Sequence, residues 1–215
     1  MSEETVKSSL TLETFNTLRN EIIQGVIRPN ERLIAADLAE RLKISRTPVR
    51  EALQLLEADD LVVALKRGYV VREHNRDEIV EIYQVRAALE GMAARLVAEQ
   101  SGTAAAKRIE AIGAHKDEVG KANDSRIVVD LNTAFHSAIF HECGNSRLER
   151  LNNSNSQHFF NYRIAGMYSK EEQLLSVRGH AAILKSIRAH DGDAADAAAR
   201  QHVMDALEVT LSKLR

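Results

Sequence analysis

Residues 45–62 read SRTPVREALQLLEADDLV, and this stretch predicts a helix with one apolar face. Ser45 is a residue type that favours helix N-caps, and Pro48 falls in the first turn, where its missing N–H removes no helical hydrogen bond. Four apolar residues then recur at helical spacing: Val49, Ala52, Leu53 and Leu56. The segment therefore turns one face to a core and leaves its basic residues on the other.

Two more helices and a hairpin are expected around this segment. A first helix has apolar residues at helical spacing and ends at Gly25: Leu12, Phe15, Leu18, Ile22 and Ile23. Pro29-Asn30 marks a turn, and residues 35–42 form a short second helix. Beyond the third helix, the β-prone residues 61–65 and 69–71 flank the basic turn Lys66-Arg67-Gly68, which is typical of a β-hairpin. Such helices with a hairpin wing predict a winged helix-turn-helix that binds duplex DNA.

The charge of the chain bears on whether it binds DNA. Its 215 residues carry a net charge of −2, so a nucleic-acid partner is not evident from composition. Seven basic residues nevertheless gather in two short stretches: Arg41, Lys43, Arg46, Arg50, Lys66, Arg67 and Arg72. A local basic face can bind phosphates on an acidic protein, with an affinity that falls with salt. Charge alone fits a solvated helix equally well.

Several classes of protein are excluded by composition. No apolar run reaches the length of a membrane span, and the start MSEETVKSSL lacks the layout of a signal peptide. The single Cys143 forms no intrachain disulfide and is expected to be a buried, inert thiol. A cytoplasmic protein without a membrane partner is predicted.

The composition changes near residue 75. Pro29 and Pro48 are the only prolines, and the chain beyond Asn75 is rich in alanine and leucine. We therefore predict a DNA-binding domain over residues 1–75 and a helical domain over residues 76–215. The second domain should hold about six helices, near 77–100, 103–121, 125–142, 146–167, 170–189 and 193–214. The predicted fold class is mainly α, with a winged helix-turn-helix followed by an all-helical bundle.

Arg86 interrupts an apolar stripe of the first of these helices. The stripe has spacings of three and four residues: Ile79, Ile82, Leu89, Ala93 and Leu96. Because a buried guanidinium without a partner is costly, Arg86 should meet an anion or carbonyl groups. An internal ion pair with a glutamate of another helix and a contact with a bound ligand both fit this pattern.

Histidines occupy the apolar faces of three separate helices. They are His136, His180 and His202, and Asn132 precedes His136 by one turn. Residues at i and i+4 can reach one point, so Asn132 and His136 could share a metal ion. One such histidine alone would be read as a hydrogen-bonded core residue. Three on inward faces favour a common centre.

Residues 10–73 resemble the N-terminal domain of GntR-family transcription regulators. The matching pieces are RLIAADLAERLKISRTPVREALQLLEADDLV at 32–62 and KRGYVV at 66–71. The resemblance implies a homodimer that binds double-stranded operator DNA at a palindromic site. The positions that match DNA-contacting residues are Ser45, Arg46, Thr47, Arg50 and Gly68, with Arg67 as a further candidate. Ala36 departs from the pattern, because many relatives have an arginine there that contacts DNA.

Residues 76–214 resemble the helical effector domain of the FadR-type subgroup. The matching pieces are QVRAALEGMAARLVAE at 84–99, LNTAFHSAIFHECGNSRL at 131–148 and GHAAILKSIRAHDGDAADAA at 179–198, with the later His202. Many members bind a divalent metal through one aspartate and three histidines, and the metal helps to hold a small carboxylate. His136, His180 and His202 match the histidines, and Arg86 matches an arginine that faces the ligand. Arg163 is a second candidate for the same pocket.

Asn132 stands where this subgroup has its aspartate. An amide oxygen can bind a metal but brings no negative charge, so the metal affinity should be lower than with aspartate. Three imidazoles still suit zinc or nickel.

We therefore predict a transcription regulator, most simply a repressor, and not an enzyme. A small organic acid bound beside the metal would control operator binding. One alternative is a metal-dependent hydrolase or lyase built on the three histidines, but it lacks a placed general base and leaves the first 75 residues unexplained. Another is a regulator for which the metal itself is the signal.

Overall fold

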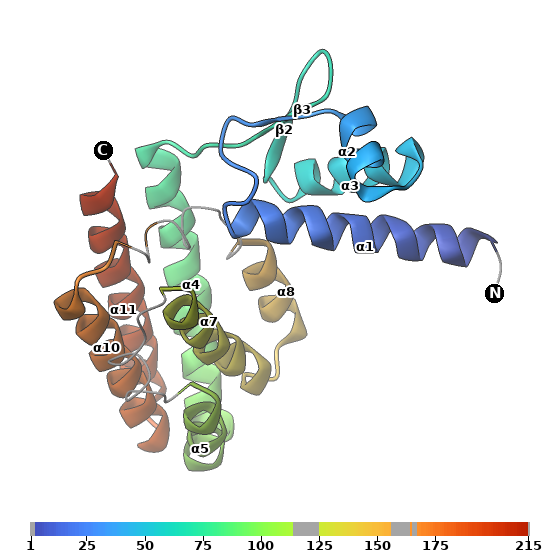
Figure 1. Ribbon diagram of the computed structural model, residues 1–215. Coiled ribbons are helices and arrows are strands. Elements are labelled where there is room, and N and C mark those ends of the chain that lie inside the picture. The colour runs from blue at the N-terminus through green and yellow to red at the C-terminus, as the bar shows by residue number, and fades with distance from the viewer. Residues whose placement is uncertain (1–2, 114–124, 156–163, 165–166, 215) are drawn as a thin grey trace. The chain divides into compact units, whose positions relative to one another are not determined.

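The computed structural model describes residues 3–113, 125–155, 164 and 167–214, and it divides into two compact units (Figure 1). Among the described residues, those up to His74 form the first unit and those from Asn75 onward form the second. None of the described helices has the length and the apolar character needed to cross a membrane.

The first unit combines three helices with a small antiparallel sheet. The helices are α1 (Glu3–Ile23), α2 (Ala35–Leu42) and α3 (Arg46–Ala58). The strands are β1 (Arg32–Leu33), β2 (Val62–Ala64) and β3 (Tyr69–Val71), in the order β1-β3-β2. This arrangement confirms the predicted helices and hairpin. Strand β1 was not predicted, because a strand of two residues is too short to show an alternating pattern; it is defined by its pairing of Leu33 with Tyr69.

The core of the first unit forms around α3. The four apolar residues of its inner face, Val49, Ala52, Leu53 and Leu56, are fully buried. They meet Leu18 and Ile22 of α1, which are also fully buried, and the hairpin contributes Val62 and Val71. The amphipathic pattern therefore holds α3 against the other elements and leaves its opposite face exposed.

In the described part of the second unit, every regular element is a helix. It contains α4 (Arg76–Gln100), α5 (Gly102–Gly113), α7 (Ser125–Glu142), α8 (Ser146–Asn155), α10 (Lys170–Arg188) and α11 (Gly192–Lys213). These helices confirm the predicted bundle. The segments predicted to continue to residues 121 and 167 extend into parts of the chain outside the described residues.

Capping side chains fix where the long helices begin. Asn75 and Glu78 form a reciprocal capping box at the start of α4, and Ser169 and Glu172 do the same for α10. The side chain of Asp191 accepts a hydrogen bond from the N–H of Ala194 at the start of α11. These bonds satisfy N–H groups that the first turn of a helix leaves without partners.

Helices α4 and α11 pack closely along their length (Figure 1). Small residues make this approach possible: Ala87, Gly91, Ala94 and Ala98 on α4 are buried, as are Ala195 and Ala199 on α11. At Gly91 a Cβ atom would lie only 2.6 Å from Oδ1 of Asp196. Helices α4 and α11 both contribute to one apolar core, which α7 and α10 share.

Candidate nucleic-acid interface and metal centre

The residues that start α3 divide sharply by exposure. Ser45, Arg46, Thr47 and Arg50 are exposed, whereas Pro48 and Val49 are buried. Ser45 is the N-cap residue, as predicted, but its hydroxyl accepts no hydrogen bond from the helix. The hydroxyl and the three side chains of the exposed face are therefore presented together at the N-terminal end of α3.

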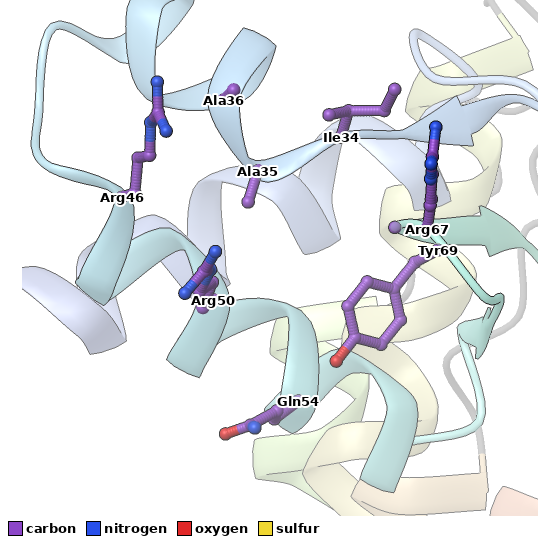
Figure 2. A pocket seen from close by; sticks show the side chains of 9 residues that line it. Ile34, Ala35, Ala36, Arg46, Arg50, Gln54, Arg67 and Tyr69 are labelled. Carbon is purple, nitrogen blue, oxygen red and sulfur yellow. The ribbon is translucent and has the colours of Figure 1, made fainter.

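A groove of about 320 Å³ runs between α3 and the hairpin wing (Figure 2). Arg46, Arg50 and Gln54 follow one another along α3, and Arg67 and Tyr69 lie across from them. The remaining lining residues are Ile34, Ala35, Ala36 and Gly68. In the described part of the chain, no carboxylate pairs with Arg46, Arg50 or Arg67. Three guanidinium groups without a carboxylate partner in that part of the chain thus line one groove. Such a groove can bind the phosphates and base edges of DNA.

The wing is held in shape by backbone contacts that the sequence did not reveal. The guanidinium of Arg32 donates from Nε and Nη2 to the carbonyl oxygen of Arg67, at 3.2 and 2.7 Å. Gly68 has a φ of 84°, and a Cβ there would lie 2.5 Å from the carbonyl oxygen of Leu33. Only glycine fits this position without strain. Arg32 and Gly68 therefore set the conformation that presents Arg67.

Three histidines from three helices converge in the second unit. They are His136 of α7, His180 of α10 and His202 of α11, and one ring nitrogen of each lies within 4.8 Å of the others. Nε2 of His136 and Nε2 of His202 are 3.2 Å apart. The ring of Phe135 stacks on His180, with centroids 3.9 Å apart. The structure thus places the three predicted histidines together; we call them the histidine centre.

The environment of His180 and His202 favours their neutral form. Burial lowers the pKa of His202 to about 3, with a further contribution from His136. Burial, again followed by His136, lowers the pKa of His180 well below its ordinary value. Nε2 of His180 is buried and has no hydrogen-bond partner among the described residues. Neutral imidazole is the metal-binding form, and a buried nitrogen without a partner is costly unless something occupies its lone pair.

Glu90 is a functional candidate that the sequence interpretation missed. Its side chain on α4 is 4% exposed; Oε1 accepts a hydrogen bond from Nε of Arg86 at 2.6 Å, and Oε2 lies 2.6 Å from Nδ1 of His136. Burial by itself would raise the pKa of Glu90, but the charge of Arg86, together with His136, outweighs it and lowers the pKa. The ionised carboxylate therefore contacts Nδ1 and leaves Nε2 of His136 for the centre.

The environment of Arg86 corrects one part of the sequence prediction. One of the two alternatives for Arg86 was an ion pair with a glutamate of another helix, but the partner, Glu90, lies one turn further along α4 itself. Of the predicted inward stripe, Ile79 and Ala93 are buried, whereas Ile82, Arg86 and Leu89 are only half-buried. A second buried stripe lies one position along: Tyr83, Ala87, Glu90, Ala94 and Val97. A carboxylate within that stripe was the signal that could have identified Glu90.

The remaining predicted residues have different outcomes. Asn132 is half-buried, and its Oδ1 accepts a long hydrogen bond of 3.5 Å from Oγ of Ser176. That oxygen therefore faces α10, the helix that carries His180. Arg163 lies outside the described residues. Cys143 is buried, and burial raises the pKa of its thiol, consistent with the inert role expected of it.

Comparison with protein families gives two matches that together span most of the chain. Residues 10–71 match the bacterial regulatory proteins of the gntR family, and residues 81–205 match the FCD domain. The second match alone covers more than half of the 215 residues.

Individual relatives agree with these matches. The HTH-type transcriptional regulator McbR of Escherichia coli is 33% identical over 134 residues, which are 62% of this chain and 61% of that protein. The HTH-type transcriptional repressor GlaR of Escherichia coli is 26% identical, with 93% of this chain and 94% of that protein covered. Among solved structures, Escherichia coli McbR/YncC superposes with a TM-score of 0.79 at 22% identity, covering 95% of this chain and 98% of that one. A GntR regulator from Rhodococcus sp. RHA1 gives 0.76 at 25% identity, covering 96% and 100%.

Proposed function

Because this chain belongs to the GntR family of bacterial regulatory proteins and carries an FCD domain, we propose that it is a repressor whose operator binding responds to a small carboxylate held beside a divalent metal ion. The family is one of transcription regulators, which confirms that the chain is a regulator and not an enzyme. The identity of the signal and its mode of action are the proposed part.

The groove between α3 and the wing supports the operator-binding part of the proposal. Helices of this kind enter the major groove with their N-terminal residues nearest the bases, where an arginine can bind O6 and N7 of guanine. Arg46 and Arg50 occupy that end of α3, and Arg67 extends the basic surface along the wing. The concave arrangement of these three exposed cations is the observation that carries the proposal.

A homodimer is part of the same proposal. On α4 the side chains of Val85 and Met92, two turns apart, are 50% and 41% exposed. Exposed apolar side chains on one helix face are a feature of surfaces that pair with another molecule. A second copy of the chain would then present a second α3, as a palindromic operator requires.

The histidine centre supports the proposed metal site. Two observations fit a shared ion that the three imidazoles would hold: the 3.2 Å separation of the two Nε2 atoms, and the buried Nε2 of His180, which has no hydrogen-bond partner in the described part of the chain. Asn132 is the proposed fourth ligand through its amide oxygen. Zinc or nickel suits this donor set, and when bound it supplies a Lewis acid that attracts a carboxylate oxygen.

Arg86 is the proposed partner for the rest of the acid. Its Nε donates to Glu90, and none of the described residues accepts a hydrogen bond from its two terminal nitrogens. The side chain is 15% exposed, so a ligand that enters the bundle could reach them. Binding would change operator affinity only if the acid favours one arrangement of the two units over the other.

Operator binding measured with and without the signal molecules tests the proposal. The operator is first selected from a random duplex library, and its affinity is then measured with chelator, with zinc alone, and with zinc plus each of a panel of small mono-, di- and tricarboxylates. We expect one acid, in the presence of zinc, to change the affinity for the operator by about 5- to 150-fold. A response to zinc alone would instead identify a metal sensor, and an affinity unchanged by every acid would contradict the proposed effector.

The histidine centre makes a separate prediction about metal binding. His136→Ala removes one of three imidazole ligands and should weaken zinc binding by about 100-fold or more, since even residues that only orient a ligand contribute about 10- to 100-fold. Competition with a chromogenic chelator measures the affinity. His141→Ala is the matched control, because His141 lies on the same helix but is exposed. Equal zinc affinity of the two variants would contradict the assignment.

A further inference from the structure

Gly179 stands at the middle of α10, where helix propensity does not favour it. Nine residues of the helix precede it and nine follow it. A glycine in a helix interior is less favourable than an alanine, because its backbone loses more conformational freedom on folding. The residue needs another reason to be there, and the neighbouring helix supplies one.

The ring of His202 occupies the space that a side chain at position 179 would need. A Cβ on Gly179 would lie 2.3 Å from Nδ1 of His202, 3.0 Å from its Cγ and 3.2 Å from its Cβ. Real Cβ atoms do not approach other atoms to 2.3 Å. These three atoms lie where the imidazole ring joins the backbone and not at the far end of a long, flexible side chain. The ring could therefore make room only by moving as a whole.

The His202 ring has little freedom to move without leaving the histidine centre. The residue is 4% exposed, and its ring is stacked on His136 with centroids 5.1 Å apart. The His180 ring, attached to the residue after Gly179, has its centroid 4.6 Å away. A displacement large enough to admit a methyl group would separate the two Nε2 atoms that now lie 3.2 Å apart.

We propose that Gly179 is a positioning residue of the histidine centre: its missing side chain admits the His202 imidazole between α10 and α11 and so aligns its Nε2 with that of His136. The inference rests on the proposed metal site, which it deepens. Gly179 acts through His202 and touches no ligand itself.

A double-mutant cycle on protein stability measures the interaction between position 179 and the His202 ring. Gly179→Ala, His202→Ala and the double variant are unfolded thermally in the presence of chelator. In the His202→Ala background the collision is removed, so Gly179→Ala should raise Tm by about 2 to 4 °C through helix propensity alone. In the wild-type background the same substitution should lower Tm. A substitution that stabilises both backgrounds equally would overturn the proposal.

Zinc affinity provides the second readout, which a general packing effect would not change. Gly179→Ala should weaken zinc binding by at least tenfold, measured by chelator competition on the folded protein. Ala182→Gly is the control, since Ala182 is exposed on the same helix: it should lower Tm and leave zinc affinity unchanged. Wild-type affinity in Gly179→Ala would overturn the positioning role. A wild-type protein that binds no zinc would overturn the metal site, and the stability comparison then decides the contact alone.

Discussion

Glu90→Ala is expected to lower the free energy of unfolding by about 3 to 5 kcal/mol, because it leaves a charged group of the bundle interior without its partner. The Glu90 side chain is 4% exposed and that of Arg86 15%, and their nitrogen and oxygen are 2.6 Å apart. Removing the carboxylate keeps the guanidinium desolvated while its stabilising charge is lost. The same substitution removes the contact at 2.6 Å from Nδ1 of His136.

The same helix provides a matched control for this effect. Arg95 and Glu99 form an ion pair at the same i,i+4 spacing, with a separation of 2.8 Å, but their side chains are 39% and 46% exposed. Because water screens exposed pairs, Glu99→Ala should lower the stability far less than Glu90→Ala does. Urea denaturation followed by circular dichroism, in chelator, measures both variants. Equal losses would show that burial does not give the Arg86–Glu90 pair its importance.

A second variant separates charge from shape at position 90. Glu90→Gln keeps the size of the side chain and one oxygen acceptor for Arg86, but it removes the negative charge. We expect a loss of stability smaller than that of Glu90→Ala, together with weaker zinc binding, because the orientation of His136 depends on the carboxylate. Wild-type zinc affinity in Glu90→Gln would limit Glu90 to a role in folding.

Arg46→Ala is expected to weaken operator binding by about 10- to 100-fold for each half-site, which corresponds to about 1 to 3 kcal/mol of base recognition. Arg46 is exposed at the first position of α3 and lines the groove that faces the wing. If two copies bind one palindrome, the loss applies to both half-sites. Fluorescence anisotropy with the selected duplex and with a scrambled duplex measures the specific part of the affinity.

Two further substitutions define what kind of contact Arg46 makes. Lys66→Ala removes an exposed charge of the wing, so it should weaken binding to both duplexes alike and reduce the salt slope by about 1. Arg178→Ala removes an exposed charge from α10 and should leave operator binding unchanged. Specific binding by Arg46→Ala that equals that of Arg178→Ala would contradict the assigned recognition helix.

The local sequence was sufficient to predict most of the elements. Helix α2 begins and ends at the predicted residues, and α3 begins directly after Ser45, since its apolar spacing and its capping signal lie within one short segment. The three histidines of the centre were also predicted, because each interrupts an apolar face of its own helix. Such features can be predicted because they depend only on the periodicity of a single helix.

The predictions that failed depended on how helices face one another. On α4 the predicted stripe is buried at Ile79 and Ala93, but a second buried stripe lies one residue along from it, and one residue is a rotation of about 100° around the helix axis. The second stripe includes Glu90, which lies inside against His136, whereas Arg86 of the predicted stripe is half-buried. Strand β1 likewise exists only because β3 pairs with it.

The amino-acid sequence was enough to predict a winged helix-turn-helix followed by a helical bundle, with arginines on the exposed face of α3 and histidines on inward faces. Only the tertiary structure decided which side chains meet: Arg32 with the carbonyl of Arg67, Glu90 with His136, and the His202 ring with Gly179. The physical reason is that spacing along one helix fixes a direction around its axis, whereas a contact requires the rotation and separation of two elements at once. Those are set by close packing of the whole core.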